Sequence, residues 1–349
     1  MSLKKAYESL FNIGTSVNRW NMKSDRAKEE LVKHYSCITA ENDMKPMFFL
    51  DEKANLENPE KYHTNPAVCF DSAIPYLEFA KENGIALRGH TLVWHFQTPF
   101  WFFKEKYDKD MEAPWASKET MLARMESYIK SVLTFTQTEY PGVIYAWDVV
   151  NEAMEEEEAD CWRKKSGWYK TVGEEFVLHA FRFAKKYIAE GVKLFYNDYN
   201  TAQPFKHSKI CELVLDPLVA EGLIDGMGMQ AHLVLQYWNP AEFAAALHKY
   251  GSYGLEVQLT ELDIHCTDPG EKGMTELATA YKELFEILVN AKKEGKANVT
   301  AVTFWGMKDD ESWLTGFRKE KSYPLLFGEN YELKEAYKAV VKVAEEARG

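Results

Sequence analysis

The amino-acid sequence predicts a single α/β domain, a (β/α)8 or TIM barrel that spans residues 1–349. Three observations support this fold class. Short apolar runs rich in β-branched residues, typical of strands buried in a parallel sheet, alternate with helical segments along the whole chain. Neither a linker nor a low-complexity tract interrupts the alternation, and no internal repeat is visible. Barrels of this kind commonly reach this length as one domain.

Eight apolar runs are expected to be strands, with helices between them. The strand segments are residues 11–17, 37–45 (a strand and its following loop together), 86–95, 144–153, 192–199, 226–232, 255–264 and 299–306. The clearest helical patterns cover residues 71–83, 117–135, 173–190, 276–293 and 330–347. The first of these helices is expected to begin at Asp71 as its N-cap and to stop at Gly84.

Composition argues against several classes of partner. The formal net charge is -12, and phosphate-rich partners require clustered Lys and Arg. No apolar run is long enough to span a bilayer. We therefore expect no nucleic-acid partner, no membrane partner and no obligate protein partner.

The cysteines bear on metal sites and on cellular compartment. The five cysteines are scattered without a CxxC pair, and His90 and His232 lie on separate predicted strands without an HxH or HExxH pairing. No metal and no cofactor are therefore expected. Scattered thiols and the lack of an apolar segment after Met1 favour a cytoplasmic location. The alternative is secretion, with a signal peptide removed from this sequence.

Two predicted strands end in carboxylates. The run 144–153 ends in Asn151 and Glu152, and the run 255–264 contains Glu261 and Asp263. Carboxylates at the carboxyl ends of barrel strands are where such enzymes keep their chemistry. Glu152 could instead simply begin the acidic, solvated turn formed by residues 155–158. Two glutamates at two strand ends favour a converging pair, and paired carboxylates are the usual means of breaking a glycosidic bond.

Other polar and aromatic side chains follow the same pattern. Each has a structural explanation when taken singly, but all are expected at one rim of the barrel, where function concentrates. They are Asn42, Lys45, His90, Trp94, Gln97, Asn197, Asp198, Gln230, His232, Trp305 and Trp313.

Seven strings in this order resemble glycoside hydrolase family 10, whose main members are endo-1,4-β-xylanases. The strings are TAENDMKP, RGHTLVWHFQTP, WDVVNEA, YNDYN, QAH, TELDI and VTFWGMKDDESWL. The resemblance implies a retaining mechanism with a covalent glycosyl-enzyme intermediate, in which Glu152 is the general acid/base and Glu261 the nucleophile. His232 and Asp263 are expected to support Glu261, and Asn151 is expected to bind the sugar 2-hydroxyl.

The resemblance also implies the substrate and its binding residues. Xylan or xylo-oligosaccharide is the expected substrate. The residues that match the family's hydroxyl-binding positions are Asn42, Lys45, His90, Gln97 and Gln230, and its aromatic walls correspond to Trp94, Trp305 and Trp313. Two departures concern fine details of the cleft: Ala231 stands where the family often has Ser, and Gly328 where Asp is common.

Two rival functions remain open. Related barrel enzymes, such as a cellobiohydrolase, β-glucanase or β-mannanase, also place Asn-Glu after the fourth strand and Glu at the end of the seventh. The strings around His90 and Trp305 favour the xylanase. A non-catalytic carbohydrate-binding barrel is disfavoured because both carboxylates are present together with His232 and Asn151.

Overall fold

The computed structural model describes residues 1–348 and divides into two compact units. The first unit comprises Met1–Glu41, Tyr199–His207 and Gly226–Gly349, and the second comprises Asn42–Asp198 and Ser208–Asp225. Each unit is an assembly of parallel strands and helices, as the predicted α/β class requires. The organisation of residues 1–349 as a single domain stays a prediction.

The second unit contains three parallel strands in the order β3-β4-β5, namely β3 (Ala86–Trp94), β4 (Ile144–Asn151) and β5 (Lys193–Asp198). Their register aligns the ends that carry the predicted site residues. His90 lies opposite Asp148 and Trp94 opposite Asn151, and Asn151 in turn lies opposite Asn197. The polar ends of three strands are therefore level with one another.

Gly89 in β3 has a clear steric role. A Cβ atom at this position would lie 2.3 Å from the ring of the fully buried Trp147 on β4. Any larger residue would clash with the Trp147 indole, so only glycine allows β3 and β4 to pair at this position.

The helices of the second unit connect and cover these strands. They are α3 (Pro46–Phe49), α4 (Glu52–Glu57), α5 (Ile74–Asn83), η2 (Phe100–Phe103), α6 (Lys118–Glu139), α7 (Gly167–Val172), α8 (Phe176–Tyr187), the π-helical η3 (Cys211–Leu215) and α10 (Asp216–Ala220). The short helix α9 (Pro204–Ile210) has residues in both units.

The remaining strands belong to the first unit, and their pairings with one another are parallel. Strand β1 lies between β2 and β9, β9 pairs with β8, and β8 also pairs with β6 and β7. The strands are β1 (Asn12–Val17), β2 (Cys37–Ala40), β6 (Gly226–Met229), β7 (His232–Val234), β8 (Glu256–His265) and β9 (Asn298–Phe304). Between β6 and β7, Ala231 adopts a φ of 61°, which divides the predicted strand 226–232 into two pieces.

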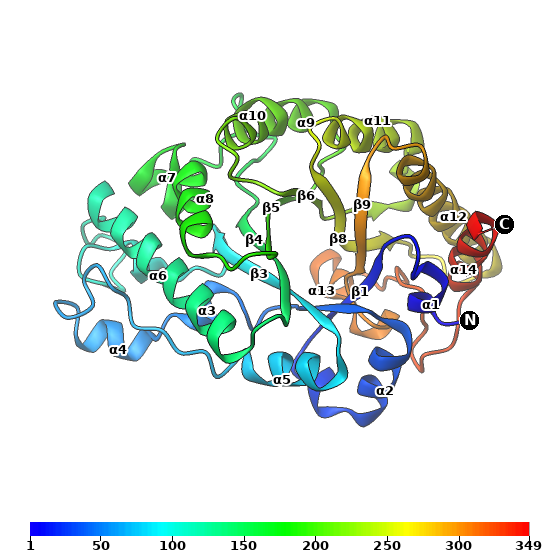
Figure 1. Cartoon of the computed structure of the whole chain (residues 1–349), viewed down its shortest axis with the longest axis horizontal. Coiled ribbons are helices and arrows are strands. Elements are labelled where there is room, and N and C mark those ends of the chain that lie inside the picture. Colours follow the sequence, from blue (N-terminus) through cyan, green and yellow to red (C-terminus); the bar gives the residue numbers. More distant parts are fainter. Residues whose placement is uncertain (349) are drawn as a thin grey trace. The chain divides into compact units, whose positions relative to one another are not determined.

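Helices of the first unit bring its two chain ends together. Helix α1 lies beside the C-terminal helix α14 (Figure 1), where the Tyr7 hydroxyl donates to the Val340 carbonyl at 2.7 Å. The Tyr337 hydroxyl likewise donates to the Met1 carbonyl at 2.8 Å. The helices are α1 (Leu3–Tyr7), η1 (Asn21–Lys23), α2 (Asp25–His34), η4 (Leu235–Tyr237), α11 (Pro240–Gly251), α12 (Glu271–Lys293), η5 (Asp309–Glu311), α13 (Trp313–Arg318) and α14 (Glu335–Arg348).

Four predicted helix starts are wrong, each for a local reason. Helix α8 begins at Phe176 rather than at Gly173, because Gly173 ends α7 with a φ of 85°. Helix α5 begins at Ile74 rather than after Asp71, because Pro75 lacks an N–H and suits the first helical turn. Helix α12 begins five residues earlier than predicted, where the Asp268 carboxylate accepts from Gly270 N at 2.8 Å and Gly273 N at 3.1 Å. Helix α14 begins at Glu335 because Leu333 forms an antiparallel bridge with Phe327.

Strands in both units are buried along most of their length, as expected for strands covered on both faces. In the described part of the chain, no helix combines the length and the apolar character needed to cross a bilayer.

Candidate active site

Glu152 directly follows β4 and has an unusual backbone conformation. Its φ is 55°, in the left-handed region that side-chain-bearing residues seldom adopt. Its backbone N–H donates to the Asn197 carbonyl at 2.9 Å, which ties it to the end of β5. Such conformations persist only where the surroundings impose them, and they concentrate at functional sites.

The Glu152 carboxylate is partly buried and accepts from its neighbours. The indole Nε1 of Trp94 donates to Oε2 at 2.9 Å, and Asn151 Nδ2 lies 3.4 Å from Oε1. His95 Nδ1 lies 3.9 Å from Oε2. With 15% of its side chain exposed, Glu152 is held in a definite direction yet can be reached from solvent.

Asn151 is oriented by the next strand. Asn197 Nδ2 donates to Asn151 Oδ1 at 2.9 Å, and both side chains are buried. This bond assigns the oxygen of the Asn151 amide to Asn197 and turns its Nδ2 towards Glu152. The predicted sugar-binding amide is thus fixed beside the predicted acid.

Asn42, Lys45 and Gln97 form a polar cluster in the second unit. Lys45 Nζ and Gln97 Nε2 both donate to Asn42 Oδ1, at 3.1 Å and 3.2 Å. The Lys45 ammonium also lies 4.6 Å from the centre of the Trp94 ring, within the range of a cation–π interaction. The cluster is therefore linked through Trp94 to Glu152.

His90 is held by a buried carboxylate that the sequence analysis did not single out. Its Nδ1 lies 2.9 Å from Asp148 Oδ2, and Asp148 also accepts from both Nε and Nη2 of Arg88. All three side chains are almost fully buried. The sequence did contain a signal that could have identified Asp148, because it lies in the middle of the apolar run 144–153. A charged side chain buried in such a strand requires a partner.

In the second unit, every residue predicted for catalysis or substrate binding thus belongs to one connected group. His90 packs beside Trp94 with ring centres 6.3 Å apart, which completes the connections. The connected residues are Asn42, Lys45, His90, Trp94, Gln97, Asn151 and Glu152.

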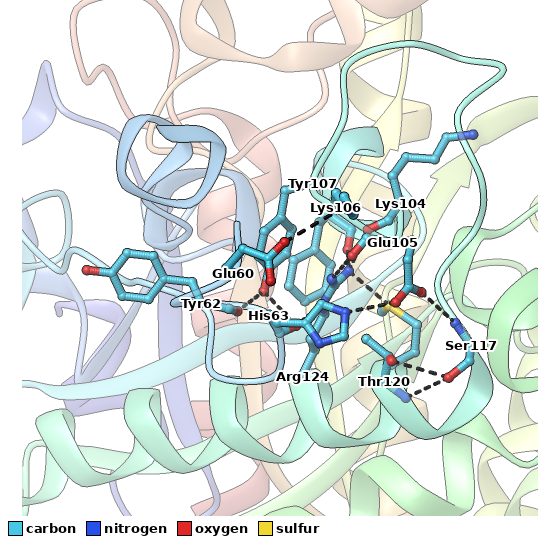
Figure 2. A network of polar contacts seen from close by, with 12 residues as sticks. Glu60, Tyr62, His63, Lys104, Glu105, Lys106, Tyr107, Ser117, Thr120 and Arg124 are labelled. Carbon is cyan, nitrogen blue, oxygen red and sulfur yellow. Dashed lines mark hydrogen bonds and ion pairs between the residues drawn. The ribbon is translucent and has the colours of Figure 1, made fainter. Parts of the chain in front are cut away.

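The loop after β3 carries Gln97 and is anchored by Arg124 of α6, another residue that sequence reasoning missed. The fully buried guanidinium donates to the carbonyls of His63, Phe102, Lys104 and Glu105, at distances from 2.6 to 2.8 Å. It also lies 3.9 Å from the centre of the Tyr107 ring. Figure 2 shows this network, in which Glu60, Tyr62 and His63 also contact Lys106, Tyr107 and Glu105, respectively.

In the first unit, Glu261 belongs to a chain of three ionisable side chains. His232 Nε2 lies 3.2 Å from Glu261 Oε2, and His232 Nδ1 lies 3.0 Å from Asp263 Oδ1. Glu261 and Asp263 are buried, with 7% and 0% of their side chains exposed. The Asp–His–Glu arrangement expected from the sequence is present in the structure.

The two carboxylates determine the protonation of His232. Burial alone would lower its pKa, but the charge and hydrogen bonding of Asp263 and Glu261 outweigh that effect and raise the pKa to about 10. Both ring nitrogens face carboxylate oxygens, which can only accept, so both must carry protons. His232 is therefore a cation at neutral pH that donates to Glu261.

Trp313, Trp305 and Gln230 surround this chain. Trp313 Nε1 donates to Asp263 Oδ2 at 2.9 Å, and its ring lies 4.8 Å from that of His232. The Trp305 ring lies 6.4 Å from His232. The carbonyl of Gln230 accepts from the backbone N–H of Glu261 at 3.0 Å. Every site residue predicted within the first unit is thus in one connected group.

Comparison with known proteins identifies the family. The model of Glycosyl hydrolase family 10 matches residues 2–343. The chain belongs to this family. Its fold class is the (β/α)8 barrel that the sequence predicts, as in the solved structures of family 10 xylanases that it resembles.

Xylanases are among the relatives of this family 10 chain. It is 55% identical over 344 residues to the endo-1,4-beta-xylanase B of Butyrivibrio fibrisolvens, which covers 99% of the chain but only 53% of that protein. It is 36% identical to a beta-1,4-xylanase of Dictyoglomus thermophilum, covering 98% of the chain and 90% of that protein. The chain therefore spans about half the length of the first of these relatives.

A solved structure resembles nearly the whole family 10 chain. The CBM22-1 and GH10 modules of the Clostridium thermocellum endo-1,4-beta-D-xylanase 10B, complexed with xylohexaose, superpose with a TM-score of 0.89 at 35% identity. The match covers 98% of this chain and 67% of that one.

A cavity of about 210 Å³ adjoins His232 in the first unit of the family 10 chain. The residues that line it come from the segment after β5, from the β7 region and from the start of α11. They are Asn200, Thr201, Ala202, Gln203, Ala231, His232, Leu233, Val234, Tyr237, Trp238, Asn239, Glu242 and Phe243. Amides and aromatic rings of this kind suit a hydroxylated ligand with apolar ring faces.

Proposed function

We propose that the chain is a retaining endo-1,4-β-xylanase that hydrolyses β-1,4-xylosidic bonds of xylan or xylo-oligosaccharides. Family membership and the activities named for its relatives support this function. The observation that carries it is the contrast between the two carboxylates. Glu261 accepts from a cationic imidazole, whereas Glu152 accepts from a neutral indole. A retaining glycosidase needs one carboxylate that attacks and a second carboxyl group that donates the proton.

In the first step, the ionised carboxylate of Glu261 attacks the anomeric carbon while the carboxylic acid of Glu152 protonates the departing glycosidic oxygen. The C–O bond to the leaving sugar breaks and a glycosyl–Glu261 ester forms. In the second step, Glu152 takes a proton from water, which attacks the anomeric carbon and releases Glu261. Two inversions leave the configuration of the sugar unchanged.

The imidazolium of His232 assists both steps by its hydrogen bond to Glu261. It stabilises the charged nucleophile before attack and the departing carboxylate during hydrolysis of the intermediate. Asp263 holds the imidazole in place and balances its charge, and Trp313 in turn holds Asp263. No metal or cofactor takes part in this scheme.

The other site residues are assigned to substrate recognition. Sugar hydroxyls are expected to bind Asn42, Lys45, His90, Gln97 and Gln230, with Asn151 at the 2-hydroxyl. The rings of Trp94, Trp305 and Trp313 are expected to pack against sugar faces. A tryptophan above the ring also excludes the hydroxymethyl group of glucose, which favours xylose.

Hydrolysis of matched aryl glycosides tests the substrate. An aryl β-xylobioside should be cleaved with a kcat/KM well above that of the aryl β-cellobioside, and hydrolysis should be insensitive to a chelator. Preference for the cellobioside or for a mannan would support the related barrel β-glycosidases instead. Binding of xylo-oligosaccharides without turnover would support a carbohydrate-binding barrel.

A further inference from the structure

The acidic run after Glu152 is not a uniformly solvated turn. Glu157 is exposed, but only 12% of the Glu155 side chain is exposed. Glu155 Oε2 accepts from Arg163 Nη1 at 2.7 Å, and 14% of the arginine side chain is exposed. One glutamate of the run therefore forms a largely buried ion pair.

Arg163 uses its other donors on the backbone around Glu152. Nε donates to the Glu152 carbonyl at 3.0 Å and Nη2 donates to the Met154 carbonyl at 3.1 Å. Its own backbone N–H donates to the Ala153 carbonyl at 3.0 Å. A single arginine thus contacts four consecutive residues, from Glu152 to Glu155.

These bonds constrain the residue with the unusual backbone. Glu152 has its N–H bound to Asn197 and its carbonyl bound to Arg163, so both of its peptide groups are fixed in the left-handed conformation. An unconstrained glutamate would relax to a negative φ, which would redirect its side chain. The bond from Trp94 to the carboxylate depends on the direction that this backbone sets.

We propose that Arg163, itself held by Glu155, is a positioning residue that fixes the proton-donating carboxyl of Glu152. Glu155 accepts from Nη1 and so sets the orientation of the planar guanidinium, whose other two nitrogens then reach the two carbonyls. The proposal rests on the proposed function, in which Glu152 is the general acid.

The leaving group of the substrate reports the position of this acid. Phenyl β-xylobioside needs proton donation when its bond breaks, whereas dinitrophenyl β-xylobioside departs as a stable anion and needs little. The value of kcat/KM reports the first, glycosylation step for both. A displaced acid therefore slows the phenyl substrate selectively, whereas general damage to the site slows both.

Glu155→Gln is the principal variant because it keeps the size of the side chain and removes only its charge. We expect kcat/KM for the phenyl substrate to fall on the order of 10- to 100-fold, as for a misplaced catalytic group, with less than about a threefold change for the dinitrophenyl substrate. Arg163→Lys should behave alike, because an ammonium cannot reproduce the planar fork. Glu157→Gln makes the same charge change at an exposed position and should match the wild type.

Glu152→Ala separates the proposal from the function on which it rests. If this variant shows the selective loss and Glu155→Gln and Arg163→Lys lose activity equally on both substrates, or not at all, the positioning role is refuted. If Glu152→Ala itself lacks the selective loss, the assignment of the general acid fails and the positioning role fails with it. Selective loss in all three variants, with Glu157→Gln unaffected, supports both.

Discussion

His232 Nε2 lies 3.2 Å from Glu261 Oε2 while the opposite ring nitrogen faces Asp263, so one imidazole serves two buried carboxylates. Only the doubly protonated ring can donate to both. The site therefore provides its proposed nucleophile with a permanent cationic partner at neutral pH, and this partner is a side chain rather than a metal ion.

The protonation of His232 can be measured directly. Its pKa of about 10 predicts that nitrogen-detected NMR at pH 8 will find protons on both ring nitrogens. Asp263→Asn should lower that pKa, since it removes the larger of the two favourable charges. His207, whose pKa is lowered by burial, serves as the internal control and should be neutral at pH 8. A neutral His232 at pH 8 would contradict the ionic chain.

The same shift predicts how stability depends on pH. A histidine whose folded-state pKa lies above its unfolded value of about 6.5 contributes stability that is fully present below that value. The contribution of His232 should therefore decline as the pH rises from about 6.5 through about 10. The free energy of unfolding, measured across this range for the wild type and His232→Gln, should converge at the alkaline end. Parallel curves would show that the shift is absent.

Replacement of Glu261 with Gln should abolish turnover and leave oligosaccharide binding largely intact. The amide cannot form the glycosyl ester, so kcat should fall by several powers of ten, on the order of losses seen for other catalytic nucleophiles. Calorimetric titration with xylotriose checks that binding survives. Hydrolysis at a near-normal rate would remove Glu261 from the mechanism.

Retention of configuration is expected at the cleaved bond. Proton NMR of the first-formed product should show the β anomer, with the α anomer arising later by mutarotation. In a crystal structure with bound ligand, the carboxyl groups of Glu152 and Glu261 should lie about 5–5.5 Å apart, the spacing of retaining enzymes. Prompt appearance of the α anomer would refute the double displacement.

Arg124 should matter for stability more than an exposed arginine does. Arg124→Met leaves four carbonyls without their buried cationic donor, and we expect a loss of about 2–4 kcal/mol in the free energy of unfolding. Arg182→Met, which breaks an exposed pair with Glu221, is the matched control and should unfold close to the wild type in urea. Equal midpoints for the two variants would show that the Arg124 network adds little.

The sequence alone determined the alternation of strands and helices and the placement of the site residues at strand ends. Both follow from local patterns, because apolar periodicity and a polar residue ending an apolar run can be recognised without neighbours in space. The ordered motifs around Glu152 and Glu261 are also local patterns, and they were sufficient to indicate the family. The helix starts were predicted wrongly because the apolar periodicity does not show where a helix begins. That position depends on individual residues such as Pro75 in the first turn of α5 and Asp268 at the start of α12.

Only the tertiary structure decided which side chains hold the site residues in place. Asp148 meets Arg88 and His90 because two strands pair in one register, and Arg124 meets the carbonyls of segments distant in sequence. Glu155 resembles its acidic neighbours in the sequence, and only the fold places Arg163 beside it. Long-range pairings of this kind depend on how the backbone brings separate segments together, and a pattern of residue types along the chain does not encode that geometry locally.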